Sequence, residues 1–480
     1  MLGQSGPLVG GRLLSAALTF ALPLALARLL TPQAFGTYKQ FFLVALTLQL
    51  TGQLGLTQSL YYFMPRGGQE RGAYVAQTMG ALAVLGAFFG TALYFAAPLL
   101  GHWLGDGALA DLRVPLALFG GLQLASAALE SVVTSEGRIA VAALTYVLSD
   151  GLRAACLVLG ALFFGPTGLF WAAALTAGLR VLALVGIVSA RVVPFSPPRA
   201  DLFRAQLAFA LPFAGSSYLY VAQRYFSQYA VSASFDAATF ALFAVASFHM
   251  PVAGIVFDPL AEVMMVQIGQ AHHAGTQRGA WTAWNDTVQR LAQILFPAAA
   301  TAWLFGAAVL PILFTQKYAG SVPLFVIATF EIPLMVLPCD ALLRAFGDTR
   351  FLLFFNGVRI AFTALFVVGG IHFFGLPGAI AGGITSEAVS RVVMMARARR
   401  FLAVGLAHMV EWPALARTAT AAAAACAPAW VAHRLPLHPL PSLFLGGIVY
   451  IGAYLGLLNL LRRRAASEAA ALAPLASANG

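Results

Sequence analysis

Apolar residues in this sequence gather in long runs, and short clusters of glycine, proline and charged residues separate one run from the next. A helix that crosses the hydrocarbon core of a membrane needs about 20 apolar residues. Fourteen runs approach this length, so the pattern predicts an all-α, polytopic membrane protein with about 14 transmembrane helices and short connections. The predicted helices cover residues 8–30, 37–63, 75–100, 114–134, 140–164, 169–190, 206–232, 239–263, 288–313, 322–343, 351–374, 377–396, 415–433 and 442–461.

The composition excludes several other classes of protein. Hydrophobic residues make up 60% of the 480 residues and charged residues only 9%, whereas a soluble chain carries roughly 25% charged residues. A soluble enzyme and a disordered scaffold are excluded because neither could have so few charges. A disulfide framework is not expected either, because each of the three cysteines lies inside an apolar run.

Lysine and arginine are distributed unevenly among the connections. If the first connection is placed outside and the rest alternate, the inside connections and the C-terminal tail hold 17 of these residues and the outside connections five. Cytoplasmic loops carry such an excess of positive charge. We therefore expect a multi-pass protein with both termini in the cytoplasm. The same bias accounts for the net charge of +11, so no nucleic-acid partner is expected.

Short motifs recur in order at an offset of 206–211 residues, which indicates an internal duplication. The matches are 71–74 with 278–281, 150–153 with 356–359, 164–169 with 374–379, and Arg180 with Arg391. Six helices separate the copies, and six is even, so both copies have the same orientation. Repeats of this kind place the substrate path between two lobes that rock against each other.

The duplication divides the chain into five parts. We expect an N-terminal six-helix lobe at 1–195, a cytoplasmic linker at 196–205 and a C-terminal six-helix lobe at 206–400. Two additional transmembrane helices follow at 401–464, and a cytoplasmic tail at 465–480 is predicted to be disordered. The lobes are predicted to be pseudo-symmetric.

Several arginines fall inside predicted spans, where a charged side chain costs about 3 kcal/mol or more and marks a pathway. Arg224 lies mid-span, has no acid within one helical turn, and shares a polar stripe with Tyr220 and Gln228. A surplus of arginine predicts a cavity of positive potential, suited to a phosphate-bearing substrate because guanidinium donates paired hydrogen bonds. The candidate cavity cations are Arg153, Arg180, Arg224, Arg359 and Arg391, with Tyr220 and Gln228 for sugar contacts.

Two intramembrane acids have two interpretations each. Asp150 stands three residues before Arg153, and Glu387 stands four residues before Arg391, so each spacing fits an intrahelical ion pair. Alternatively, either carboxylate couples transport to H⁺ or Na⁺. Three further acids lie close to the inner ends of spans and are expected to reach the membrane surface: Glu130, Glu262 and Asp340.

Motifs for other chemistry are missing from the sequence. No glycine-rich phosphate-binding loop ends in Gly-Lys-Ser/Thr, so direct use of ATP is not expected. No histidines have metal-ligand spacing within a helix. No predicted outside loop is long enough for a glycosyltransferase site. We therefore expect neither a cofactor, a bound metal nor an enzyme.

Three motifs resemble the bacterial polysaccharide (O-antigen type) flippases of the multidrug/oligosaccharidyl-lipid/polysaccharide exporter superfamily. They are the end of the first helix at 26–38, the Leu-Gly-Leu turn at 54–56 followed by an arginine at the end of 61–66, and the Gly-x-Thr-Arg loop at 345–350. One departure is that Gln223-Arg224 stands where members of the family often carry Asp-Arg.

This resemblance implies a fold of two six-helix lobes, here with two extra helices as in the lipid II flippases. It implies movement of a polyprenyl-pyrophosphate-linked oligosaccharide across a bacterial cytoplasmic (inner) membrane, for exopolysaccharide or O-antigen lipopolysaccharide synthesis. The implied partners are the lipid-linked oligosaccharide, membrane lipid, a polysaccharide polymerase and glycosyltransferases, and a coupling ion.

Two other functions stay open on the sequence alone. A cation-coupled multidrug exporter of the same fold would need an acidic cavity rather than a basic one. A membrane scaffold of a glycan-synthesis complex would transport nothing, and its buried charges would be ion pairs only.

Overall fold

The computed structural model describes residues 2–190, 196–248, 251–436 and 438–477, and over these ranges the chain is helical, with no strand. The helices form two compact units, Met1–Ala244 and Val245–Gly480. Each unit is described by itself below.

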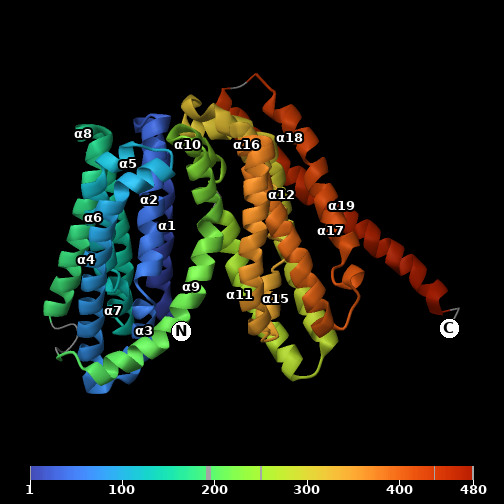
Figure 1. The fold of residues 1–480 in the computed structure, drawn as a ribbon. Coiled ribbons are helices and arrows are strands. Elements are labelled where there is room, and N and C mark those ends of the chain that lie inside the picture. Colours follow the sequence, from blue (N-terminus) through green and yellow to red (C-terminus); the bar gives the residue numbers. More distant parts are fainter. Residues whose placement is uncertain (1, 191–195, 249–250, 437, 478–480) are drawn as a thin grey trace. The chain divides into compact units, whose positions relative to one another are not determined.

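The N-terminal unit is a bundle in which α1 packs against α8, α4 against α6, and α6 against α8 (Figure 1). Helix α9 packs on α2, α3 and α4. Its helices are α1 (Leu2–Leu29), α2 (Pro32–Gly52), α3 (Leu56–Phe63), α4 (Arg71–Trp103), α5 (Ala108–Asp111), α6 (Arg113–Ala125), α7 (Leu129–Ser135), α8 (Ile139–Ser189), α9 (Ala200–Ser234) and most of α10 (Ala237–Ala246).

The C-terminal unit is built around α12, which contacts α11, α13, α14, α16, α17, α18 and α19. Helix α15 fills the space between α11 and α16. The helices are α11 (Pro251–His273), α12 (Gln277–Phe314), α13 (Val322–Ala328), α14 (Glu331–Leu334), α15 (Cys339–Ala345), α16 (Thr349–Leu402), α17 (Trp412–Ala424), α18 (Cys426–His433) and α19 (Pro439–Ser477).

Two long elements, α8 and α16, each hold two predicted spans joined by a sharp turn. The turns occur at Gly165 (φ 68°) and Gly375 (φ 62°), a left-handed conformation that glycine adopts without a steric penalty. Both turns lie where the repeated motifs predict them, and the sequence prediction of a tight connection is confirmed at each.

Glycine pairs hold the two arms of each turn close together. A Cβ atom on Gly160 would lie 2.6 Å from the carbonyl oxygen of Gly168, too close for any side chain, and Gly370 and Gly378 meet in the same way. The two arms pack backbone to backbone, as small residues permit between membrane helices.

The prediction of continuous helices is wrong for five spans. The structure breaks the spans predicted at 37–63, 114–134, 239–263, 322–343 and 415–433 into shorter helices. The first break follows from Leu54 and Gly55, both with positive φ, and the break before α15 coincides with Pro338, which cannot continue a helix. In the internal repeat, the spans at 37–63 and 114–134 correspond to the spans at 239–263 and 322–343, so both copies are interrupted in the same two spans.

The linker and the tail also differ from expectation. Helix α9 begins at Ala200, inside the predicted linker at 196–205, and the preceding residues 191–195 lie outside the described residues. Helix α19 continues to Ser477, through most of the tail predicted to be disordered. The tail is rich in alanine and leucine, which favour helix strongly.

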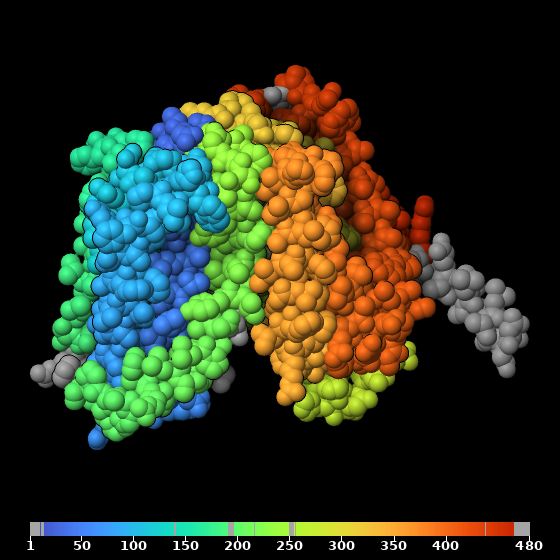
Figure 2. Space-filling model, viewed as in Figure 1, coloured from blue at the N-terminus to red at the C-terminus, as the bar shows by residue number. Residues whose placement is uncertain are grey.

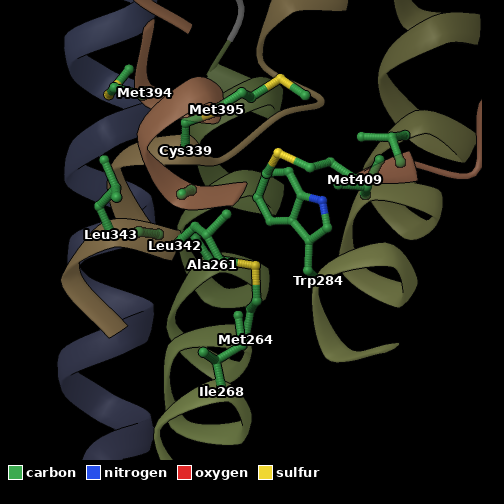
Figure 3. Close-up of a cluster of buried hydrophobic side chains, with 14 of the residues drawn as sticks. Ala261, Met264, Ile268, Trp284, Cys339, Leu342, Leu343, Met394, Met395 and Met409 are labelled. Atoms are coloured by element: carbon green, nitrogen blue, oxygen red, sulfur yellow. The ribbon is translucent and has the colours of Figure 1, made fainter. Parts of the chain in front are cut away.

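The core of the C-terminal unit is rich in sulfur. Figure 3 shows Trp284, which is fully buried, in one cluster with Met264, Cys339, Met395 and Met409. Unbranched methionine side chains fill irregular gaps between helices of different direction. This cluster joins α11, α12, α15, α16 and the segment before α17.

Exposure is inverted relative to a soluble protein. The first half of α16 (orange in Figure 2) exposes Phe354, Phe373 and Phe374 at 72–74%, whereas Arg391 in its second half is buried. Seven helices in the described ranges are long and apolar enough to cross a membrane, and two of them, α8 and α16, contain a turn. Apolar side chains outside and charges inside define a multi-pass membrane protein.

Candidate functional site

Asp150 and Arg153 form an intrahelical ion pair in the first arm of α8. The Arg153 guanidinium lies 2.7 Å from the Asp150 carboxylate, and both side chains are about one-fifth exposed. Ser15 of α1 donates a hydrogen bond to the other carboxylate oxygen. The ion-pair interpretation of this spacing is confirmed, and the pair also attaches α1 to α8.

Arg180, in the second arm of α8, pairs with Glu130 of α7 at 2.8 Å. Both side chains are nearly buried, at 14% and 13% exposed. The expectation that Glu130 reaches the membrane surface is therefore wrong, because a cation 50 residues away in the sequence holds the carboxylate inside the bundle. The Nε atom of Arg180 is buried and has no hydrogen-bond partner.

Glu387 lies between two arginines in the C-terminal unit. It accepts from Arg391, one turn later on α16, at 2.7 Å, and from Arg359 on the preceding arm. Asp340 of α15 lies 3.8 Å from Arg359. Arg391 also donates to the carbonyl oxygen of Leu337, which lies in the break before α15 and accepts a second hydrogen bond from the backbone N–H of Cys339. The ion-pair interpretation is again confirmed.

The predicted surplus of unpaired arginine is therefore wrong for four of the five candidate cations, Arg153, Arg180, Arg359 and Arg391. The reason is that their partners stand partly on other helices, at sequence separations that spacing rules do not cover. Paired charges neutralise one another inside the membrane and offer fewer donors to a ligand.

A cavity of about 390 Å³ lies beside the Glu387 cluster, inside the C-terminal unit. Carboxylates outnumber guanidinium groups on its walls, and it lies within one unit, whereas the sequence predicts a cationic path between the two repeats. Glu262 and Asp340, expected at the membrane surface, both line it. The charged lining residues are Asp258, Glu262, Glu331, Asp340, Glu387, Arg344, Arg359 and Arg391.

Arg224, the fifth candidate, differs from the other four. It is exposed on α9, and over the described residues no carboxylate lies within the 4.0 Å of an ion pair. Its guanidinium donates to the hydroxyl of Tyr220, one turn earlier, at 3.1 Å. Gln228, one turn later, is half-buried. The predicted stripe of Tyr220, Arg224 and Gln228 is thus an accessible polar surface.

Two buried amides that the sequence analysis did not single out attach α9 to the N-terminal unit. Gln206 is fully buried, donates to Ser59 of α3 and Thr78 of α4, each at 2.7 Å, and accepts from Gln77 at 2.8 Å. Near the other end of α9, Gln40 of α2 donates to Ser232 at 2.7 Å. A glutamine among apolar residues is the signal that could have revealed them.

These contacts explain why the packing boundary differs from the predicted lobe boundary. The sequence places the start of the second lobe at 206, whereas the compact unit extends to Ala244 and includes all of α9. The first helix of the second repeat therefore packs with the first repeat.

A smaller charged cluster lies where α9 begins. Arg199 pairs with Glu70 at 2.7 Å and with Asp201 at 2.5 Å. The Arg199 guanidinium lowers the pKa of the Asp201 carboxyl through this hydrogen bond. Among the residues that the structure describes, no group of three or more His, Cys, Asp or Glu side chains could hold a metal ion.

Helical bundles with buried charge clusters, broken spans and hairpins at matching places define a transporter-type membrane fold, and solved structures share it. A multidrug resistance MATE family transporter of the MOP superfamily, in an inward-facing conformation, aligns with a TM-score of 0.67 and 17% identity over 81% of this chain and 94% of that chain. The lipid II flippase MurJ, in an inward closed conformation, aligns with a TM-score of 0.73 and 11% identity over 97% of this chain and 99% of that chain. A MOP superfamily transporter from Pyrococcus furiosus aligns with a TM-score of 0.55 and 16% identity over 83% of this chain and 94% of that chain.

The family follows from the sequence itself. Residues 25–323, more than half of the chain, match the family described as polysaccharide biosynthesis protein, and the chain belongs to this family. The resemblance drawn from the three motifs is thereby confirmed. Among curated protein sequences, none matches the chain.

Proposed function

We propose that this protein is a flippase that moves a polyprenyl-pyrophosphate-linked oligosaccharide from the cytoplasmic to the outer leaflet by alternating access, in exopolysaccharide or O-antigen synthesis. Membership of the polysaccharide biosynthesis family supports the pathway. The fold shared with a lipid II flippase supports the kind of transport. The proposal places the protein in a bacterial inner membrane, with both termini in the cytoplasm and polysaccharide polymerase and glycosyltransferases as partners.

The observation that carries the proposal is that Arg224 is exposed and has no carboxylate partner among the described residues. A charged, hydrated pyrophosphate crosses hydrocarbon only at a large cost, which a polar, hydrated surface removes. A guanidinium without a carboxylate partner keeps its donors for phosphate oxygens. Arg224 is exposed and its partners are the hydroxyls of Tyr220 and Tyr225 rather than an acid, so it is the candidate cation best prepared to bind the pyrophosphate.

The test uses the full chain in proteoliposomes and a fluorescent prenyl-pyrophosphate oligosaccharide. Arg224→Glu is expected to lower the translocation rate at least tenfold, and Arg224→Lys to retain part of it. Arg204→Glu, an exposed arginine near the start of the same helix, is the matched control and should change little. Unchanged transport by a folded Arg224→Glu protein would contradict the proposal and would favour the scaffold.

We also propose that Glu387 or Asp150 couples transport to H⁺ or Na⁺, although each carboxylate is already paired with arginine. The expected result is that Glu387→Gln abolishes the dependence of the rate on an imposed ion gradient. Transport that follows the gradient equally well in both Glu387→Gln and Asp150→Asn would reject this assignment.

One observation favours the second candidate, a cation-coupled multidrug exporter. Five carboxylates and three guanidinium groups line the cavity of the C-terminal unit, an excess that would attract a cationic compound. The same proteoliposomes loaded with a cationic dye separate the two functions. Dye efflux that depends on Glu387, without movement of the lipid-linked oligosaccharide, would identify an exporter.

A further inference from the structure

We propose that α3, the 3₁₀ turn that extends it (Met64–Arg66), and α9 form a docking platform for the sugar–pyrophosphate head group, made by Tyr62, Phe209 and Arg66. This inference rests on the proposed function, since the head group is that of its substrate. It adds a second binding site to the surface around Arg224, with aromatic rings for the sugar and a separate guanidinium for the phosphate.

The rings form an ordered, open surface. Tyr62 and Phe209 stack with centroids 4.7 Å apart and planes 20° apart. Phe63 supports both rings edge-on, at 5.0 Å from Tyr62 and 5.7 Å from Phe209. Despite these contacts, the side chains of Tyr62 and Phe209 remain 42% and 40% exposed.

Arg66 adds an accessible positive charge to this surface. Its guanidinium lies 4.1 Å from the centroid of the Tyr62 ring and donates one hydrogen bond, of 3.0 Å, to the Tyr62 carbonyl oxygen. Within the ranges that the structure describes, no carboxylate pairs with it. Arginine has five N–H donors, so most of them stay available for an anion. Stacking on the ring fixes the direction in which they point.

The buried amide contacts hold the platform in register. Ser59 of α3 lies one turn before Tyr62, and Gln206 of α9 lies one turn before Phe209. The hydrogen bond from Gln206 to Ser59 therefore brings the two rings to the same level, where α3 and α9 pack side by side (Figure 1). A surface that the core positions is better suited to binding than one formed by loose side chains.

The platform matches a glycosyl pyrophosphate chemically. A sugar ring has C–H groups on its faces and hydroxyl groups on its edge, so it stacks on flat aromatic rings while its hydroxyls stay hydrated. The adjoining pyrophosphate carries the negative charge that Arg66 complements. An aromatic belt at the membrane surface, with an arginine that reaches lipid phosphate, would also place these groups here, and the vesicle measurement below separates the two.

The platform and Arg224 lie on the same helix, α9, which contains Pro212 and is bent along its length (Figure 1), and their spacing places them on one side of it. Phe209, Phe213, Tyr220 and Arg224 stand at i, i+4, i+11 and i+15, and the three rings are all 40% or more exposed. At 1.5 Å per residue, about 22 Å of helix separates Phe209 from Arg224. The head group can therefore bind first at the platform and then move along this face to Arg224.

The experiment measures binding to the purified full chain and transport in proteoliposomes. One probe is a short prenyl-pyrophosphate oligosaccharide, and the other is the same prenyl pyrophosphate without sugar. Tyr62→Leu and Phe209→Leu should each weaken binding of the sugar-bearing probe about three- to tenfold and leave the sugar-free probe unchanged. Arg66→Gln should weaken both probes. The matched control is the pair of Arg113 and Tyr94, whose guanidinium and ring are 5.1 Å apart, and Arg113→Gln should affect neither probe.

Equal losses for both probes in Tyr62→Leu, or none in either, would overturn the platform. If Tyr62→Leu does not fold, Arg66→Gln decides, since its exposed side chain is not part of the core. If Arg66→Gln weakens binding to phosphatidylglycerol vesicles and leaves the binding of both probes unchanged, Arg66 is a lipid contact and the inference is rejected. A wild-type protein that binds the sugar-bearing probe but moves none of it refutes the proposed function, not the platform.

Discussion

The ion pair of Arg180 and Glu130 allows a quantitative test of how buried charge is stabilised in this protein. Both side chains are nearly buried, and the 2.8 Å contact joins α7 to α8. Replacing Arg180 by alanine leaves the Glu130 carboxylate uncompensated in the bundle. Removing one partner of such a pair costs about 3–5 kcal/mol. Replacing both, as in Arg180→Met with Glu130→Gln, should restore most of this free energy because no charge stays stranded.

The control is the pair of Glu70 and Arg199, in the same unit. Here both side chains are exposed, Glu70 at 42% and Arg199 at 49%. Exposed ion pairs contribute little to stability, so Glu70→Ala should be nearly silent. The assay is the free energy of unfolding in mixed micelles, from denaturing-detergent titrations. The reasoning is refuted if Arg180→Ala and Glu70→Ala cost the same, or if the double variant is less stable than Arg180→Ala.

Two further predictions concern α9 and its C-terminal connection. Gln206→Ala leaves the buried Thr78 hydroxyl and the Gln77 amide without the partner they have in Gln206, whereas the Ser59 hydroxyl keeps its bond to the Leu56 carbonyl oxygen. The expected loss of stability is about 1–3 kcal/mol in the same assay. A loss no larger than that of Gln270→Ala, on the exposed surface of α11, would show that the Gln206 amide does not stabilise the bundle. Hydrogen bonds from the Thr239 side chain and from the Thr239 backbone N–H, the latter 3.0 Å from the carboxylate, lower the pKa of Asp236. The contribution of the ionised Asp236 to the free energy of unfolding should be present above the ordinary carboxyl pKa of about 3.9. It should be lost as the pH falls through the lowered pKa of the folded protein. Asp236→Ala should cost about 0.5–2 kcal/mol at neutral pH, and a stability difference that persists unchanged at pH 2 would contradict this.

The helices and the hairpins were predictable because their signals are local. Apolar runs mark the spans, and Gly165 and Gly375 stand in repeated motifs that mark the turns. The breaks within spans also have local causes, at Gly55 and Pro338. They were not predicted because each lies inside an apolar run long enough for a whole span, and a single glycine or proline does not by itself indicate that such a run is interrupted.

The electrostatic partners were not predictable, because they depend on which helices become neighbours. Nothing in the spacing of Arg180 points to Glu130, and Arg359 meets Glu387 only after the turn of α16 brings its arms together. Arg224 was identified correctly as a cation without a nearby acid, since that property depended on its own helix alone.

The attachment of α9 has a consequence for how the chain can be divided. A cut before α9, between the two copies of the internal repeat, would separate Gln206 and Ser232 from their hydrogen-bond partners in the first copy. A cut after α10, which ends at Ala246, would keep each of those bonds within a single polypeptide. Two co-expressed fragments, 1–247 and 248–480, are therefore the halves from which a working split protein should reassemble.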